Sequence, residues 1–180
     1  RVAQTRINKV WNAAPYGDAD VEALQLLAMV LGGDEASRLS RRLRGDVPLV
    51  DRINTWMSVQ ELAGTFNISM DVRAGVDPAR VEQVITEELA RLLAEGPGAD
   101  ELELARAESR SRFIRGFETV HARAEALNEC ATFTGNPGCF RDQLERINTV
   151  SADQLVAAGR RWLGQGDMTL LVVPGTRAPV

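Results

Sequence analysis

Apolar residues recur at two spacings along this 180-residue chain, and each spacing predicts one kind of element. Strict alternation of apolar and polar residues is clearest at residues 66–72. The apolar positions there would share one face of a half-buried strand: Phe66, Ile68, Met70 and Val72. Residues 53–59 alternate in the same way, and the short ELAG connection between the two segments predicts an antiparallel hairpin. Further strands are predicted at residues 2–12 and in the apolar stretch MTLLVVPG.

Spacings of three and four residues predict the helices. Residues 21–31 would form a helix that begins after Asp18 or Asp20 and ends at Gly32 and Gly33. Asp77-Pro78 opens another helix, since Asp caps and Pro suits the first turn. Its predicted buried stripe is Val81, Val84, Ile85, Leu89, Leu92 and Leu93. Four more helices are predicted at residues 35–44, from Asp100 to about Phe133, at residues 140–148 and after Ser151.

The resulting order is one strand, two helices, two strands, four helices and a last strand. This order predicts an α+β fold, a mainly antiparallel sheet with helices covering one face. We expect residues 1–180 to form a single domain, and the absence of an initial Met leads us to expect a fragment of a longer, multidomain protein. No stretch of about 18 apolar residues is present, so we expect no membrane insertion.

Composition excludes one class of partner. The formal net charge is -4 and aromatic residues make up only 5% of the chain, whereas nucleic-acid-binding domains usually show a basic balance or stacking aromatics. We therefore expect no nucleic-acid partner.

Cys130 and Cys139 lie nine residues apart, around the sequence TGNPG. Free cysteines are among the most buried residues, which favours two buried thiols here, with a disulfide as the alternative. The spacing is not that of a zinc knuckle, and no His lies nearby in the sequence.

The chain contains a single histidine, His121, which we expect to be an ordinary helix residue. One His cannot build the two-histidine zinc motifs of metallopeptidases, and neither a Gly-x-Ser-x-Gly elbow nor a phosphate-binding loop is present. The acidic residues between Asp100 and Glu108 are predicted to form a solvated helix face, paired with nearby arginines. The residues themselves thus indicate no catalytic site and no metal site.

Several strings, in their order, resemble the M16 family of zinc metallopeptidases, the pitrilysin and insulinase family. ADVEALQLLAMVLGG is similar to the family's helix that ends in Leu-Gly-Gly, and SRLSRRLR at residues 37–44 is similar to its Ser-Arg-Leu-x-x-x-Leu-Arg segment. The hairpin, the Asp-Pro helix and the late string INTVSADQLVAAGRRWL also fit, so the resemblance covers nearly the whole chain.

The resemblance implies a fold and a role. Domains of the family pair into a clamshell around a chamber, and one of them binds zinc through His-x-x-Glu-His and a more distant Glu. The zinc activates water and polarises the scissile carbonyl. This chain lacks the motif, so it would be a non-catalytic domain whose partners are a catalytic M16 domain, in the same chain or in another subunit, and the extended peptide substrate. Zinc would sit in the catalytic partner.

Two other functions stay open. One is a non-enzymatic scaffold or processing-partner subunit on the same fold, similar to the core-protein relatives of respiratory complexes. The other is an unrelated α+β binding module. We expect Trp11, Trp56 and Tyr16 to belong to the core, and each is also a candidate for a partner interface.

One residue is a candidate for substrate binding. Many family members carry an Arg at the end of the Ser-Arg-Leu segment and a Tyr seven residues later, which together contact substrate near the zinc. Arg44 matches the Arg, whereas the Tyr position holds Asp51, which could pair with Arg44 instead. The other arginines near this segment are expected to form a solvated or inter-domain ion-paired face: Arg38, Arg41, Arg42 and Arg52.

Overall fold

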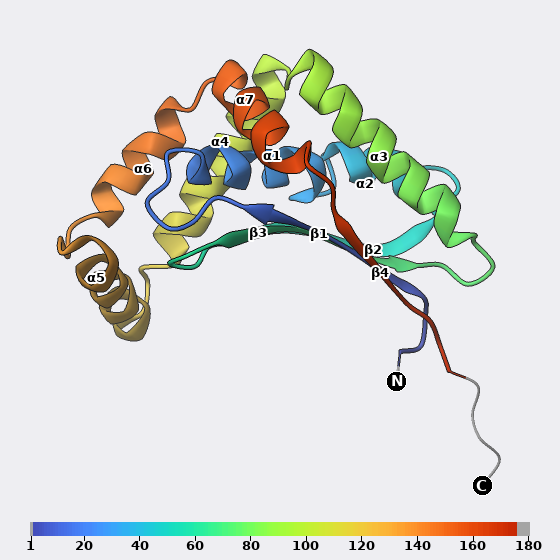
Figure 1. Ribbon diagram of the computed structural model, residues 1–180, viewed down its shortest axis with the longest axis horizontal. Helices are drawn as coiled ribbons and strands as arrows, with labels where there is room; N and C mark the ends of the chain where they lie inside the picture. Colours follow the sequence, from blue (N-terminus) through green and yellow to red (C-terminus); the bar gives the residue numbers. More distant parts are fainter. Residues whose placement is uncertain (1, 176–180) are drawn as a thin grey trace, which may run out of the picture.

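A four-stranded antiparallel sheet forms the base of the computed structural model, which describes residues 2–175 (Figure 1). Its strands are β1 (Arg6–Ala13), β2 (Val50–Ser58), β3 (Gly64–Val72) and β4 (Met168–Val172), in the spatial order β2-β3-β1-β4. Every neighbouring pair is antiparallel, including the predicted β2–β3 hairpin. The predicted α+β class is confirmed.

The helices arch over one face of this sheet and leave the other face open (Figure 1). They are α1 (Val21–Gly32), α2 (Arg38–Leu43), α3 (Pro78–Glu95), α4 (Ala99–Arg115), α5 (Val120–Thr134), α6 (Phe140–Thr149) and α7 (Ala152–Leu163). Each described helix is too short or too polar to span a membrane.

Within residues 2–175, five helices lie between β3 and β4, so the prediction of four was wrong. The long helix expected from Asp100 to about Phe133 is two helices, α4 and α5. Gly116 ends α4, and the side chain of Thr119 then accepts a hydrogen bond from the backbone N–H of Ala122, which starts α5 in a new direction. The apolar spacing runs across this break and concealed it.

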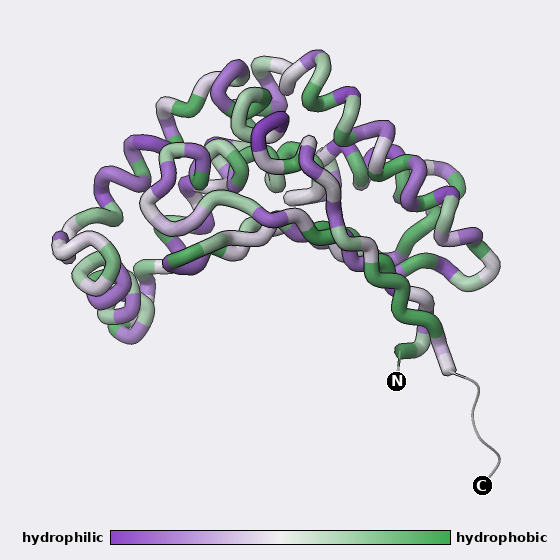
Figure 2. Tube along the Cα trace, in the orientation of Figure 1, coloured by the Kyte–Doolittle hydropathy of each residue, from purple (hydrophilic) through white to green (hydrophobic). Residues whose placement is uncertain are grey.

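The core lies between the helices and the inner face of the sheet. The predicted face of β3 is confirmed, because Phe66, Ile68, Met70 and Val72 are each 1% exposed or less. The predicted stripe of α3 is buried apart from Leu93, which is partly exposed, and Glu88 is buried within it. The trace of α3 accordingly alternates between hydrophobic and hydrophilic residues (Figure 2).

The open face of the sheet is largely polar. It carries alternate residues of the strands, among them Asn8, Asn54, Asn67 and Ser69, all of them half-buried or exposed. Trp56 lies on this face with 39% of its surface exposed, whereas Trp11 is buried in the core at 2%. The expected core position is therefore confirmed for Trp11 and wrong for Trp56, which remains a candidate for a partner interface.

Cys130 and Cys139 form a disulfide, so the preference for two free thiols was wrong. The bond joins the last turn of α5 to the residue before α6, and the ring of Tyr16 packs nearby on Phe133 at 4.8 Å between centroids. A disulfide suits α5 because this helix packs mainly on α6 and buries only Cys130 among its own residues. Tyr16 thus contacts the domain's own helix.

The buried face of β3 allows a direct test. Met70 is fully buried and faces Ile7 of β1 and Ile53 of β2 in the register. Met70→Asp places an unpaired charge there, and we expect it to lower the free energy of unfolding by at least about 3 kcal/mol in urea denaturation. The matched control is Asn67→Asp, on the open face of the same strand, with an expected change below about 1 kcal/mol. Equal effects of the two substitutions would contradict the register.

Candidate functional site

The arginines of α2 are held by carboxylates from two other helices. The guanidinium of Arg38 donates to both carboxylate oxygens of Glu101 in α4, at 2.7 Å to Oε2, and also to the carbonyl of Gly96. Arg41, one turn later on the same face, donates to Glu101 Oε1 at 2.7 Å. The Arg38 side chain is only 7% exposed, so it is an internal brace, and the expectation of a solvated or inter-domain face was wrong for it.

Glu101 has an unusually acidic carboxyl group. The hydrogen bonds from Arg38 are the main cause that lowers its pKa from 4.5 to about 2, with help from the backbone N–H of Gly98, while partial burial acts in the opposite direction. The same carboxylate therefore starts α4 and fixes α2 against it.

Arg42 braces α2 against α3. Its guanidinium donates to Glu88 at 2.9 Å and to Glu87 at 3.0 Å. Glu88 is 1% exposed, and Arg91 also binds it, at 2.7 Å. These bonds hold the pKa of the Arg42 guanidinium above its usual value. Arg52, by contrast, is exposed on β2, as expected.

Arg44 lies directly after α2 and is the candidate substrate contact. Its guanidinium donates to Glu35 at 2.5 Å, and 37% of the side chain is exposed. Asp51 does not pair with it, because Asp51 binds Arg73 at 2.9 Å and accepts a hydrogen bond from Gln4 at 2.6 Å. The expectation that Asp51 could pair with Arg44 was therefore wrong, and the partner that Arg44 does have, Glu35, is exposed.

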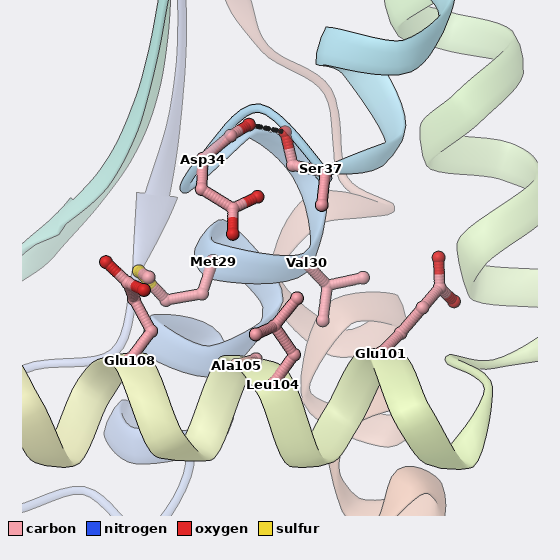
Figure 3. Close-up of a pocket in the computed structure, with 9 residues that line it drawn as sticks. Met29, Val30, Asp34, Ser37, Glu101, Leu104, Ala105 and Glu108 are labelled. Atoms are coloured by element: carbon pink, nitrogen blue, oxygen red, sulfur yellow. Dashed lines mark hydrogen bonds between the residues drawn. The ribbon is translucent and has the colours of Figure 1, made fainter.

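A small pocket lies between α4 and the loop that joins α1 to α2 (Figure 3). Its apolar wall is formed by Met29 and Val30 of α1 and Leu104 of α4. The carboxylates of Asp34, Glu101 and Glu108 also line it. The cavity volume is about 20 Å³, which is close to the space that one water molecule needs. Since Glu101 is also neutralised by two arginines, this pocket does not fit a substrate.

The described residues contain no group of three or more His, Cys, Asp or Glu side chains placed to hold a metal ion. His121 is on the surface of α5, with 84% of its side chain exposed, and its Nε2 lies 3.2 Å from a carboxylate oxygen of Glu125.

Sequence reasoning missed the role of Glu101 and assigned it to a solvated face of α4. A signal was present, because Arg38 and Arg41 are three residues apart on one helix face and need a shared counter-charge. The sequence does not indicate which of the many acidic residues supplies that charge. In the structure it is Glu101, which is 60 residues away from Arg41 in the chain.

The family model described as the peptidase M16 inactive domain matches residues 1–109. Comparison with curated protein sequences finds no significant match.

Solved structures share the whole fold at low sequence identity. An inactive peptidase domain from Bordetella parapertussis is 20% identical with a TM-score of 0.85, and the match covers all of this chain and 98% of that one. A protease from Helicobacter pylori is 16% identical with a TM-score of 0.85, over 96% of this chain and 42% of that one. A chain of complex III2 from Candida albicans is 11% identical with a TM-score of 0.82, over 94% of this chain and 42% of that one.

The depressed pKa of Glu101 predicts a pH effect. A carboxyl group whose pKa is lower in the folded state stabilises the fold above its unfolded pKa, and this contribution is lost as the pH falls from about 5 to about 2. We expect Glu101→Gln to lower the free energy of unfolding by roughly 2 kcal/mol at pH 7. The difference from the unsubstituted chain should shrink through that acidic range, as measured by urea denaturation at several pH values.

The control is Glu108→Gln, two turns later on α4. The Glu108 carboxylate lies 3.6 Å from the Arg112 guanidinium, which is a weaker contact than those of Glu101. It should change stability by less than 1 kcal/mol. A pH-independent difference for Glu101→Gln would contradict the assigned role of its charge.

Proposed function

This chain belongs to the peptidase M16 inactive domain family, and on that premise we propose that it completes the substrate chamber of an M16 zinc peptidase and helps to hold the extended peptide. The observation that carries the proposal is a complete M16 domain fold built on a chain with a single histidine. The two-histidine zinc motif must then come from a catalytic partner domain, and this domain's contribution is to bind and to enclose.

We also propose that residues 1–180 are one domain of a longer, multidomain protein. The Helicobacter pylori protease supports this, because the chain spans only 42% of its length. The catalytic domain would then lie in the same protein or in a partner subunit.

Arg44 is the residue that we propose for contact with the substrate. Exposed ion pairs such as Arg44–Glu35 stabilise a fold by about 1 kcal/mol or less, so Arg44 can exchange Glu35 for a peptide carbonyl or carboxylate at little cost. Arg38 and Arg42 cannot, since each is held by several bonds from neighbouring helices.

A non-enzymatic scaffold subunit is the second candidate. The similarity to a chain of complex III2 from Candida albicans favours it, because the same fold occurs there in a large assembly. The two candidates differ in whether peptide cleavage depends on this chain.

The test mixes this chain with an M16 domain from the same source that carries His-x-x-Glu-His. Cleavage of an unstructured fluorogenic peptide is measured for each protein alone and for the mixture, and bound zinc is counted in each. We expect cleavage in the mixture alone, at least tenfold above either part, with zinc on the catalytic domain. A stable complex that cleaves no peptide would favour the scaffold, and zinc or activity on this chain alone would overturn both.

The role of Arg44 is tested in the same mixture. We expect Arg44→Ala to lower kcat/KM by about tenfold, which corresponds to the loss of one charged contact of about 1.4 kcal/mol. Melting temperature and complex formation should stay unchanged. Arg115→Ala, which removes an exposed arginine at the end of α4, is the control and should leave kcat/KM unchanged. Equal kcat/KM for both variants would exclude Arg44 as a substrate contact.

A further inference from the structure

Helix α5 is attached to the rest of the domain chiefly by the disulfide at its end. Cys130 is the one buried residue of this helix, and its sulfur is bonded to Cys139. Within residues 2–175, the side-chain hydrogen bonds and ion pairs of α5 stay inside the helix or reach the residues that flank it. The helix lies at the outer end of the arch of helices (Figure 1). The disulfide therefore carries much of what fixes α5.

Helix α6, on the other side of the disulfide, is anchored independently of it. The guanidinium of Arg146 donates to Glu22 of α1 at 2.9 Å, and the side chain of Glu22 is only 4% exposed. Ile147 of α6 is also buried in the core. Breaking such a buried ion pair is costly, so α6 is expected to stay in place without the disulfide. The sulfur of Cys139 would then remain with the domain, whereas that of Cys130 would be free to leave with α5.

The two cysteines of this bond differ in exposure and in surroundings. Cys130 is 4% exposed, whereas Cys139 is half-buried, so an incoming thiolate reaches Cys139 more easily. The hydroxyl of Tyr16 lies 3.4 Å from Cys139 Sγ, and burial raises the pKa of Tyr16, so this hydroxyl keeps its proton at neutral pH. A thiolate accepts hydrogen bonds more strongly than a disulfide sulfur does. Tyr16 therefore favours the reduced form of Cys139.

We propose that the Cys130–Cys139 disulfide is a redox-sensitive switch that fixes α5 in the oxidised chain and releases it in the reduced chain. The reductant is a dithiol. One of its thiolates attacks Cys139 Sγ and displaces Cys130 Sγ, which takes up a proton. The second thiol of the reductant then attacks the mixed disulfide and releases Cys139 as a thiol. Two electrons and two protons pass to the protein, and the dithiol becomes a disulfide.

Release of α5 is a local event that leaves the core intact. Isolated helices shorter than about 12–15 residues are marginal in water, and α5 has 15 residues. Once the bond is reduced, the stacking of Phe133 on the ring of Tyr16 is the main contact left at this end of the helix. We therefore expect α5 to open while the sheet and α1 stay folded. The switch belongs to this chain alone and does not rest on the proposed function.

The first test asks whether the disulfide is reduced in the folded chain. The chain is incubated with dithiothreitol at pH 7.5, and free thiols are alkylated with N-ethylmaleimide and counted by mass spectrometry. The rate of global unfolding is measured by tryptophan fluorescence after jumps in urea concentration, extrapolated to zero urea. We expect reduction to be at least tenfold faster than global unfolding, because Cys139 is accessible in the folded state. Equal rates would overturn the proposal, since the bond would then open only when the whole domain unfolds.

The second test locates the effect by hydrogen exchange of the oxidised and the reduced chain, read by mass spectrometry. We expect the amides of residues 120–134 to exchange at least tenfold faster after reduction, because α5 loses its covalent attachment. The amides of residues 64–72, in the central strand β3, should change by less than twofold. Unchanged exchange in α5, or faster exchange throughout the sheet, would overturn the proposal.

Two variants separate the bond from the reagent. Cys139→Ser keeps Cys130 but cannot form the disulfide, so its α5 should exchange as in the reduced chain, with or without dithiothreitol. Tyr16→Phe keeps the ring on Phe133 and removes only the hydroxyl, and we expect its equilibrium constant for reduction by glutathione to fall at least threefold. A response of Cys139→Ser to dithiothreitol, or an unchanged constant for Tyr16→Phe, would contradict the assigned roles. If Cys139→Ser does not fold, the reduced unsubstituted chain decides the question.

Discussion

The packing of α1 between the sheet and the helix layer is the contact on which the other elements depend. Ten of its twelve residues are buried. At its end Gly32 lies so close to β2 that a Cβ there would be 2.6 Å from Thr55 Cγ2, and the Thr55 hydroxyl donates to the carbonyl of Ala28 at 2.6 Å. On the opposite side, a Cβ on Gly159 of α7 would meet Leu27 at 2.7 Å. A helix enclosed in this way has little surface for a ligand, so binding residues must come from the periphery of the domain.

Charges inside the domain connect elements, and this explains why an acidic chain carries an arginine-rich helix. Three largely buried charges have a partner from a distant part of the chain: Glu88 with Arg42, Glu22 with Arg146, and Lys9 with Asp167 at 2.5 Å. An isolated charge in these places would cost several kcal/mol, whereas a paired one fixes the relative position of two elements. The arginines of α2 belong to this framework. Arg44, directly after α2, is different because its carboxylate partner, Glu35, is exposed.

The sequence predicts what depends on local periodicity and misses what depends on distant neighbours. Alternation along residues 66–72 located β3 and its buried face, and Asp77-Pro78 located the start of α3. The break between α4 and α5 was not predicted, because the helical spacing of apolar residues continues through Gly116. The sequence did not predict the Cys130–Cys139 disulfide or the contacts of Glu101. Both depend on the approach of separate helices, which no local pattern encodes. Arg44 was named as a candidate by resemblance alone.

A domain without metal ligands can promote peptide cleavage only through binding and positioning. Contacts that hold the peptide equally in the ground state and in the transition state raise kcat/KM without raising kcat, whereas contacts that align the scissile bond with the zinc-bound water raise kcat as well. In the function proposed above, the exposed guanidinium of Arg44 would serve the second role, because it can strengthen its contact as charge develops on the substrate.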